Sequence, residues 1–263
     1  MAKGVHSKSA EMDKERCLDI PLDLVKLKPV LCPDDPSSNA CAQILASIKR
    51  LGVKKYLPCG STRVGDLRVL GRGWAGVVFA GLTEEGEIVA VKALHTRSRR
   101  KSALREAVLW YAAGVANVAP NVLAISDKAF SYKLIDGVPL LSYEPRGCRE
   151  LRFLVAKLLW KAHILDKIWI RHNELARPHK QVIVERGTAE PYIIDYDSAT
   201  ISECPSNITQ LLGGLFSLRQ VRECINHLHP AENPDVRELL RRYKDTCSSE
   251  PLKTLLEHVL RGD

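Results

Sequence analysis

The chain has 263 residues, of which 45% are hydrophobic and 27% are charged, a balance typical of one large or two small globular domains. The longest apolar stretch, 108–119, is far too short to cross a membrane, so a membrane-spanning protein is excluded. An excess of 39 lysines and arginines over 31 aspartates and glutamates gives a net charge of +8. This favours contact with polyanions, whether phosphate-bearing ligands, acidic protein or nucleic acid.

The first twenty residues are charged and contain no apolar segment of the kind that directs secretion, so a cytoplasmic location is expected. The chain has eight cysteines, and none of them forms a CxxC pattern, which argues against a structural zinc site. Buried free thiols are the expected state. Disulfides between some N-terminal cysteines remain an alternative, because some heat-adapted intracellular proteins contain them.

In chain order, residues 1–59 are expected to form an N-terminal extension with one helix. This segment is polar at first, then punctuated by prolines, and then carries apolar residues at helical spacing across 38–51. The apolar positions are Cys41, Ile44, Leu45, Ile48 and Leu51, and Gly52 ends the predicted helix.

Residues 60–136 are expected to form a small, mainly β lobe. Strands are predicted at LRVL (67–70), VVFAG (77–81), EIVAVKAL (87–94), VLAI (122–125) and FSYKL (130–134). A helix is predicted at 101–113, with Leu104, Ala107, Val108 and Tyr111 on one apolar face.

Residues 137–263 are expected to form a short helical lobe. The segment 148–165 carries a strong apolar stripe, which consists of Leu151, Leu154, Val155, Leu158, Leu159 and Ala162. A hairpin of VIV (182–184) and YII (192–194) follows, and then helices are predicted at 207–227, 233–244 and 250–261. A β-rich lobe joined to a helical lobe would place a cleft between them, a favoured position for a ligand.

The stretch LGRGWAGVVFAG contains Gly71, Gly73 and Gly76 in the spacing GxGxxG. In dinucleotide-binding folds this motif opens a helix, but here a predicted strand follows it, so that interpretation fails. Glycines at the tip of a hairpin let backbone amides approach phosphate groups closely. A plain glycine-rich turn is the alternative.

Lys92 lies sixteen residues after Gly76 in the strand VAVK, on the same predicted side as Ala90. A lysine in an apolar strand needs an anionic partner to offset its desolvation. Phosphate oxygens would serve, and Glu106 in the following helix could orient the ammonium group. Alternatively, Lys92 extends to solvent at the strand end and Glu106 is an ordinary helix charge.

Together these elements resemble the ordered signature set of the protein-kinase fold: G71-x-G-x-x-G-x-V78, VAVK92, the helix residue Glu106, H172-x-E174-L175 and IID195. More narrowly, the HxELxRPxK run and the ending IIDYDSA resemble the compact atypical kinases. These include the RIO type, the small kinase of the KEOPS complex, and a group of predicted archaeal serine/threonine protein kinases. The resemblance covers about residues 60 to 230 and implies an α+β, two-lobed kinase-like fold.

The resemblance also implies roles for individual residues. The three glycines would cover the phosphates of ATP, Val78 and Ala90 would contact adenine, and Ile135 would lie in the hinge at 133–136. Lys92 would hold the α- and β-phosphates and pair with Glu106. Asp195 would bind Mg²⁺ or Mn²⁺, and Glu174 would accept the proton of the substrate hydroxyl. His172 would be a structural residue that bonds the backbone near the metal-binding loop.

Three departures from the family pattern affect these roles. Glu174 replaces an aspartate, which moves the carboxylate by roughly 1.5 Å, and a misplacement near 1 Å can cost about a hundredfold in rate. The family asparagine that binds a second metal is replaced by Gln181 or by Lys180, depending on the alignment. Asp197 is either a further metal ligand or a turn residue. The peptide-docking region of large kinases is expected to be mostly missing.

The resulting prediction is an ATP- and Mg²⁺-dependent phosphotransferase that acts on serine or threonine of a protein. Two alternatives stay open. The first is a small-molecule kinase of the same fold. The second is an ATP-binding or ATPase switch that docks on RNA or a ribonucleoprotein through its basic surface, such as the RSRRK cluster at 97–101.

Overall fold

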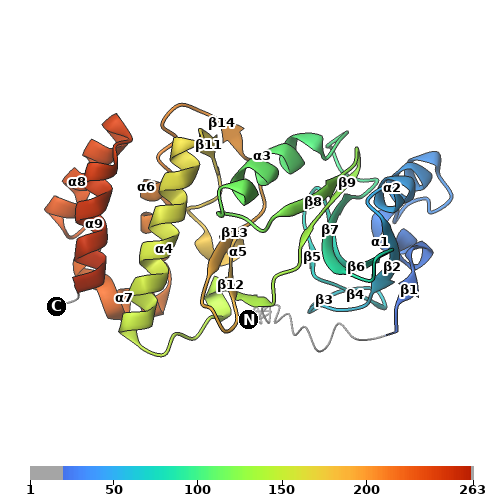
Figure 1. Cartoon of the computed structure of the whole chain (residues 1–263), viewed down its shortest axis with the longest axis horizontal. Helices are drawn as coiled ribbons and strands as arrows, with labels where there is room; N and C mark the ends of the chain where they lie inside the picture. Colours follow the sequence, from blue (N-terminus) through green and yellow to red (C-terminus); the bar gives the residue numbers. More distant parts are fainter. Residues whose placement is uncertain (1–19, 262–263) are drawn as a thin grey trace, which may run out of the picture. The chain divides into compact units, whose positions relative to one another are not determined.

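The computed structural model describes residues 20–261 and has an α+β architecture of helices and antiparallel sheets (Figure 1). The chain divides into two compact units. The described part of unit 1 comprises residues 20–104 and 123–142, and that of unit 2 comprises residues 105–122 and 143–261. Within residues 20–261, no helix has both the length and the apolar character that crossing a membrane requires.

Unit 1 is built on a twisted sheet whose strand order is β1-β2-β6-β7-β9-β8, with β5 paired to β6. All predicted strands are confirmed. A separate two-stranded ribbon is formed by β3 and β4, and a short strand, β10, and a 3₁₀ helix, η3, end the unit. The bounds of the strands and of η3 are β1 Leu22–Asp23, β2 Val53–Leu57, β3 Thr62–Val64, β4 Leu67–Val69, β5 Gly71–Arg72, β6 Gly76–Thr83, β7 Ile88–Leu94, β8 Val122–Ile125, β9 Ala129–Lys133, β10 Gly137–Pro139 and η3 Leu140–Ser142.

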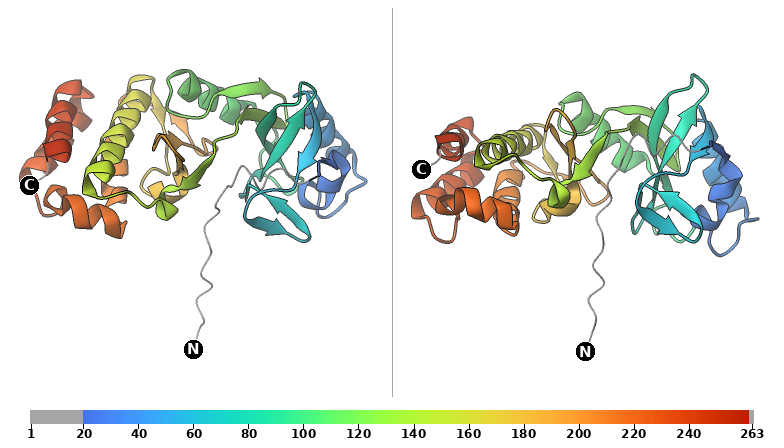
Figure 2. Two further views of the ribbon diagram at one scale, coloured as in Figure 1. Left: turned by 60° about the horizontal axis from the view of Figure 1, so that its bottom comes forward. Right: turned by 90° about the horizontal axis from the view of Figure 1, so that it is seen from below.

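The core of unit 1 lies between one face of the sheet and the segment that precedes it in sequence. This segment contains the 3₁₀ helix η2 (Leu24–Leu27), α1 (Lys28–Leu31) and α2 (Asn39–Lys49), which lie against the sheet in both views of Figure 2. The predicted helix at 38–51 is confirmed as α2, and all five of its apolar positions are buried. Ser38 caps the helix by accepting a hydrogen bond from the backbone N–H of Cys41 at 3.2 Å.

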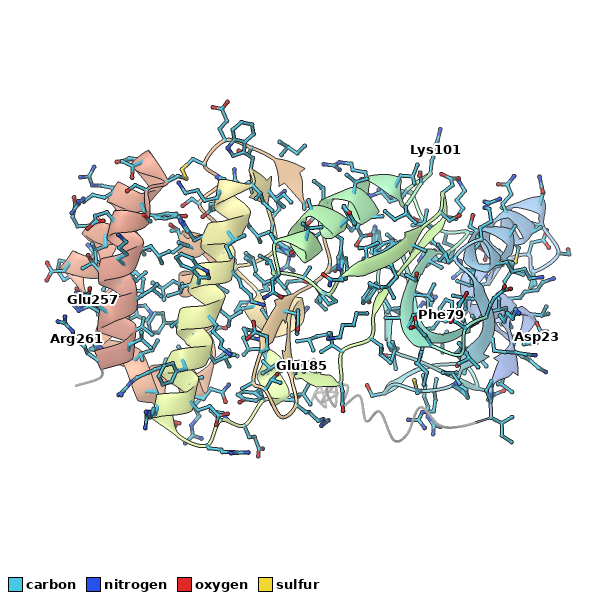
Figure 3. The ribbon with its side chains drawn as sticks, in the orientation of Figure 1. Asp23, Phe79, Lys101, Glu185, Glu257 and Arg261 are labelled. Atoms are coloured by element: carbon cyan, nitrogen blue, oxygen red, sulfur yellow. A yellow bond between two sulfur atoms is a disulfide. The ribbon has the colours of Figure 1, made fainter. Side chains whose placement is uncertain are left out.

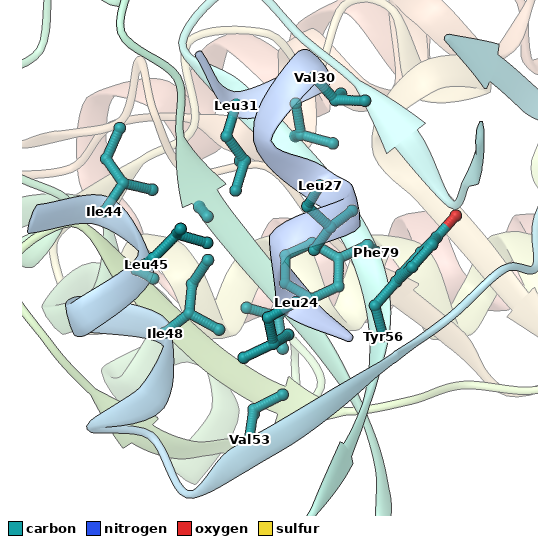
Figure 4. Packing of buried hydrophobic residues seen from close by; sticks show 14 of the residues in the cluster. Leu24, Leu27, Val30, Leu31, Ile44, Leu45, Ile48, Val53, Tyr56 and Phe79 are labelled. Atoms are coloured by element: carbon teal, nitrogen blue, oxygen red, sulfur yellow. The ribbon is translucent and has the colours of Figure 1, made fainter. Parts of the chain in front are cut away.

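Alternate residues of β6 and β7 fill this core. Phe79 is fully buried against Tyr56, with ring centroids 6.1 Å apart in an edge-on arrangement, and Leu24, Leu27 and Ile48 surround it (Figure 4). The valines of both strands suit a pleated, buried surface because branched side chains pack well there. Residues 20–57 therefore supply about half of the core of unit 1 and add two strands to its sheet.

Unit 2 is largely helical and is organised around α4 (Cys148–Lys167), which packs against α6, α7 and α9. The predicted apolar stripe of this helix is confirmed, because all six of its residues are buried. The hairpin of VIV and YII is also confirmed, as antiparallel pairing of β12 and β13. The bounds of the other elements are α3 Leu104–Val115, β11 Ile170–Arg171, α5 Pro178–Gln181, β12 Val182–Glu185, β13 Pro191–Ile193, β14 Thr200–Ile201, α6 Asn207–Leu215, α7 Arg219–Ile225, η4 Asn226–Leu228, α8 Pro234–Thr246 and α9 Ser249–Arg261.

The side chains of unit 2 are drawn in Figure 3, where Glu185 marks the end of β12, and Glu257 and Arg261 mark the last helix. The helices predicted at 233–244 and 250–261 correspond to α8 and α9. The single helix predicted at 207–227 is wrong, because the chain breaks it into α6 and α7. Ser217 donates from its hydroxyl to the Gly214 carbonyl at 2.7 Å, and Leu218 adopts an extended conformation that starts a new helix.

The apolar face predicted for the helix at 101–113 is also wrong, except for Ala107. Leu104, Val108 and Tyr111 are exposed, and Val108 keeps 58% of its surface accessible. The buried face instead carries Trp110, whose indole N–H donates to the Pro120 carbonyl at 2.9 Å. This hydrogen bond and the packing of Trp110 against Tyr196 turn the Trp110 side of the helix toward the interior. The predicted apolar face therefore points to solvent.

The expectation of free thiols is wrong as well, since no cysteine is free within residues 20–261. Disulfides join Cys32 to Cys41, Cys148 to Cys224 and Cys204 to Cys247, and Cys59 is also disulfide-bonded. The Cα atoms of the three pairs are 5.7, 5.2 and 5.6 Å apart, as a disulfide requires. The first pair matches the alternative of a disulfide in the N-terminal segment, whereas spacing gave no signal for the other two.

The Cys148–Cys224 disulfide closes a segment with a sequence separation of 76 and ties the start of α4 to α7. Replacing both cysteines by serine should lower the free energy of unfolding of unit 2 by about 2–4 kcal/mol, because the unfolded chain gains conformational freedom. Denaturant titration followed by tryptophan fluorescence measures this, since three of the four tryptophans lie in unit 2.

The matched control replaces Cys32 and Cys41, whose disulfide lies in unit 1 and closes a separation of only 9 residues. This variant should leave the transition of unit 2 in place. An unchanged transition in the Cys148/Cys224 variant would contradict the prediction.

Candidate functional site

The predicted nucleotide-binding residues of unit 1 share one face of the sheet, opposite the core. Val78 on β6 lies directly across from Lys92 on β7, and Ala90 lies two residues before Lys92 on the same strand. Side chains at such positions project on one side. The other side of these strands carries Val77, Phe79, Val89, Val91 and Ala93, all buried in the core.

Lys92 is buried, with 9% of its surface accessible. This burial argues against the alternative that Lys92 extends to solvent at a strand end. Glu106 is also buried, but it belongs to α3, which from Arg105 onward lies in unit 2. The pairing of Lys92 with Glu106 stays a prediction.

The glycine-rich stretch forms β5, a tight turn and the start of β6. Gly73 donates from its backbone N–H to the Gly76 carbonyl at 2.9 Å, and Trp74 at the tip is 82% exposed. A side chain at Gly76 would collide with the Ala93 carbonyl oxygen, so this glycine is explained by close packing of β6 on β7. A Cβ atom at Gly71 would meet no heavy atom within 4 Å. Close packing therefore does not account for a glycine at this position.

Ile135, predicted to lie in the hinge, is located between β9 and β10 in unit 1 and is buried. Its side chain therefore supports the local packing, and only its backbone groups could contact a ligand.

In unit 2, Asp195 lies two residues after the end of β13 at Ile193, and its φ angle is +68°. Non-glycine residues rarely adopt this left-handed conformation, and such residues cluster at functional sites. His172 fixes the preceding residue, because its Nε2 lies 2.9 Å from the Ile194 carbonyl oxygen. The predicted structural role of His172 is thus confirmed.

His172 is fully buried, and burial lowers the pKa of its imidazole. A neutral ring with its proton on Nε2 fits both contacts. Nε2 then donates to the Ile194 carbonyl, while Nδ1 accepts from the backbone N–H of Glu174 at 3.4 Å. The histidine therefore positions the backbone on both sides of the site and has no remaining nitrogen for acid–base work.

Gln181 connects Glu174 with the loop that carries Asp195. Its side-chain Nε2 donates to Oε2 of Glu174 at 3.0 Å, and its backbone carbonyl accepts from the backbone N–H of Ile194 at 2.9 Å. A second donor, Arg177, lies 3.4 Å from the same Glu174 oxygen. Lys180, the alternative to Gln181, precedes it on α5, and the bond to Glu174 comes from Gln181.

The side-chain oxygen of Gln181, Oε1, is buried and accepts no hydrogen bond from residues 20–261. Its orientation is set by Glu174, since an amide turned the other way would place two oxygens against each other. A buried acceptor without a donor costs free energy. Within the described residues, no group of three or more His, Cys, Asp or Glu side chains could hold a metal ion.

The segment that leads into Glu174 is held by Asn207, a residue that the sequence pattern did not indicate. Its Oδ1 accepts from the backbone N–H of His172 at 2.9 Å, and its Nδ2 donates to the Ile170 carbonyl at 2.7 Å. The same amide donates to Oδ1 of Asp166 at 2.7 Å, and Tyr243 donates to Oδ2 at 2.8 Å. No signal of spacing could have found this set, because its members are far apart in the chain.

Two further contacts brace the segment after Asp195. Asn173 donates from Nδ2 to the Ser198 carbonyl at 2.8 Å, and Arg105 donates to the Ala199 carbonyl at 2.8 Å. Asp197 lies in this segment two residues after Asp195, and its role as metal ligand or turn residue stays open. The segment is therefore tied both to the Glu174 loop and to α3.

Tyr196 is completely buried next to Asp195, against Trp110 and His172, with ring centroids 5.5 and 5.1 Å away. Its hydroxyl has no hydrogen-bond partner among residues 20–261, and burial raises its pKa well above the usual value. The ring therefore contributes packing, while the hydroxyl is a buried polar group without compensation.

Comparison with known proteins gives no match to any family model and none to any curated protein.

Replacing Tyr196 by phenylalanine should leave the free energy of unfolding unchanged or raise it by about 1 kcal/mol, because an unpaired buried hydroxyl is removed. Urea titration measures this change. Tyr243→Phe is the matched control. Its hydroxyl bonds Asp166 at 2.8 Å and lies 2.7 Å from Nδ1 of His163, so its loss should cost about 1–3 kcal/mol. Equal destabilisation by the two variants would contradict the assignment.

Proposed function

We propose that this chain is an ATP- and Mg²⁺-dependent phosphotransferase with a two-lobed, kinase-like fold. The observation that carries the proposal is the link made by Gln181 between the carboxylate of Glu174 and the loop of Asp195. Phosphoryl transfer needs a base near the acceptor hydroxyl and a cation near the phosphates, and little covalent chemistry from the protein. The sequence motifs assign these two tasks to the ends of one hairpin.

The donor set fits a magnesium or manganese ion. Asp195 would supply a carboxylate oxygen and Gln181 its unpaired amide oxygen, and both are hard ligands of the kind that Mg²⁺ prefers. Mg²⁺ is commonly held by one or two protein ligands together with phosphates and water. When bound, the ion would neutralise the charge of the β- and γ-phosphates.

The chain's own residues would perform the remaining tasks. Glu174 would accept the proton of the acceptor hydroxyl, while Arg177 and Gln181 hold its Oε2 and so restrict the carboxylate to one orientation. Lys92 would bind the α- and β-phosphates, paired with Glu106. Gly71, Gly73 and Gly76 would cover the phosphates, and Val78 and Ala90 would contact adenine beside the hinge at Ile135.

The preferred acceptor is serine or threonine of a protein, and a small-molecule acceptor is the alternative within the same chemistry. A second function, an ATP-dependent switch on RNA or a ribonucleoprotein, is favoured by the net charge of +8. In the RSRRK cluster, however, Arg97 is paired with Asp34, which reduces the charge available there.

The proposed location is the cytoplasm. Disulfides are rare in the cytosol except in the intracellular proteins of hyperthermophiles. The disulfides of this chain therefore restrict the cytoplasmic proposal to that case.

The test is incubation of the protein with γ-labelled ATP, Mg²⁺ or Mn²⁺, and a mixture of generic protein acceptors. Glu174→Gln should lower labelling at least about a hundredfold while ATP binding persists, because only the base is lost. Asp195→Asn should abolish metal-dependent transfer. Asp235→Asn, which removes an exposed carboxylate from the start of α8, is the control and should retain full activity.

Full transfer by Asp195→Asn would overturn the assignment of this residue. Release of free phosphate without labelled protein would favour the switch. Labelling of a sugar or lipid head group alone would favour the small-molecule kinase.

A further inference from the structure

A cavity of about 570 Å³ lies in unit 2 between the start of α4 and the turn of the β12–β13 hairpin. None of the residues assigned to phosphoryl transfer lines it. Its wall combines cationic and apolar side chains, namely Arg146, Arg149, Phe153, Leu154, Lys157 and Ala189.

The cavity has an excess of positive charge, because its lining carries the three cations Arg146, Arg149 and Lys157 against the one carboxylate of Glu150. Glu150 accepts from the Tyr143 hydroxyl at 2.6 Å and from the backbone N–H of Arg146 at 2.6 Å. On the hairpin, Glu190 is shared by two lysines, Lys157 at 2.8 Å and the buried Lys161 at 2.7 Å. No ion pair within residues 20–261 joins the guanidinium group of Arg146 or of Arg149 to a carboxylate, and both side chains are exposed.

The position of these arginines adds to the effect. Helix α4 is 20 residues long and starts after Gly147, which provides no side-chain cap. The N–H groups of its first turn and the positive end of the helix dipole therefore face the same region as the two arginines. Cations at a helix start are unfavourable alone, and an arriving anion would be stabilised by all of these groups together.

Part of the cavity wall is apolar. It consists of Phe153, which is 49% exposed, Leu154 and Ala189. The guanidinium carbon of Arg149 lies 6.0 Å from the centre of the Phe153 ring. A ligand that fits would place an apolar side chain on this wall and carboxylates at the rim.

We infer that this cavity is a docking site for an acidic segment of a partner protein, with an apolar residue as its anchor. An arginine guanidinium group can bind a carboxylate through two parallel hydrogen bonds. The cavity is large enough for one apolar side chain and its neighbours. RNA fits less well, because the cations surround one cavity instead of forming a stripe that could follow a phosphate backbone. The Cys148–Cys224 disulfide anchors the first turn of α4 and keeps the site preformed.

The inference does not depend on phosphoryl transfer, so binding alone tests it. The probe is a fluorescently labelled peptide with one central leucine and four glutamates on each side, and the readout is fluorescence anisotropy with the full chain. Arg146→Gln/Arg149→Gln should weaken binding about tenfold or more, which corresponds to about 1.4 kcal/mol. Phe153→Ser should weaken the leucine peptide but not a peptide with serine in place of leucine.

Arg241→Gln/Lys253→Gln is the matched control, because it removes two exposed cations of unit 2 from α8 and α9, outside the cavity. This variant should bind like the original chain, and all variants should melt at similar temperatures. Absence of saturable binding, or equal weakening by the control pair, would overturn the inference. Tighter binding of a single-stranded RNA, lost in Arg146→Gln/Arg149→Gln, would assign the cavity to nucleic acid instead.

Discussion

The arrangement of unit 2 depends on the amide of Asn207, which bonds the chain at three places. It accepts from the backbone of His172 and donates to the Ile170 carbonyl and to the buried carboxylate of Asp166. Burial raises the pKa of Asp166, while the hydrogen bonds from Asn207 and Tyr243 act in the opposite direction. An isolated carboxylate would be costly here, and the network makes it tolerable by satisfying both of its oxygens. The loop of Glu174 is thus held by α4, α6 and α8 at once.

This network fixes the position of the loop that carries Glu174. His172 is fixed at its backbone by Asn207, and its ring then fixes the Ile194 carbonyl one residue before Asp195. Gln181 connects the two segments, with one hydrogen bond to the carboxylate of Glu174 and one from the backbone N–H of Ile194. Because each link is a hydrogen bond between buried or half-buried groups, few alternative arrangements of these residues are available. Such supporting contacts are what a site requires to hold reacting groups within a fraction of an ångström.

The sequence predicted those features that depend on local pattern. The strands, α2, α4 and the hairpin follow from periodicity, and His172 was assigned its structural role from the resemblance. The failures have tertiary causes. The prediction of which face of α3 is buried was wrong, because the indole of Trp110 donates to the Pro120 carbonyl and brings its own side of the helix into the interior. The disulfides of unit 2 and the contacts of Asn207 join residues that are distant in sequence, and no spacing rule predicts such pairs. Residues 20–57 were expected as an extension, yet their helices fill the core because the sheet would otherwise expose Phe79 and its neighbours to water.

The hairpin links the two regions of unit 2 to which we assign ligands. One end of β12 follows Gln181, and the turn beyond its other end carries Thr188 and Ala189, which line the cationic cavity. The strand is 4 residues long, so it spans roughly 13 Å at the rise of an extended chain. Pairing of Val182 with Ile193 and of Val184 with Pro191 makes this connection stiff. A protein held at the cavity would therefore be held at a nearly fixed distance from Glu174. If both proposals hold, docking of an acidic segment would raise the local concentration of the attached acceptor without any change in the reactive loop.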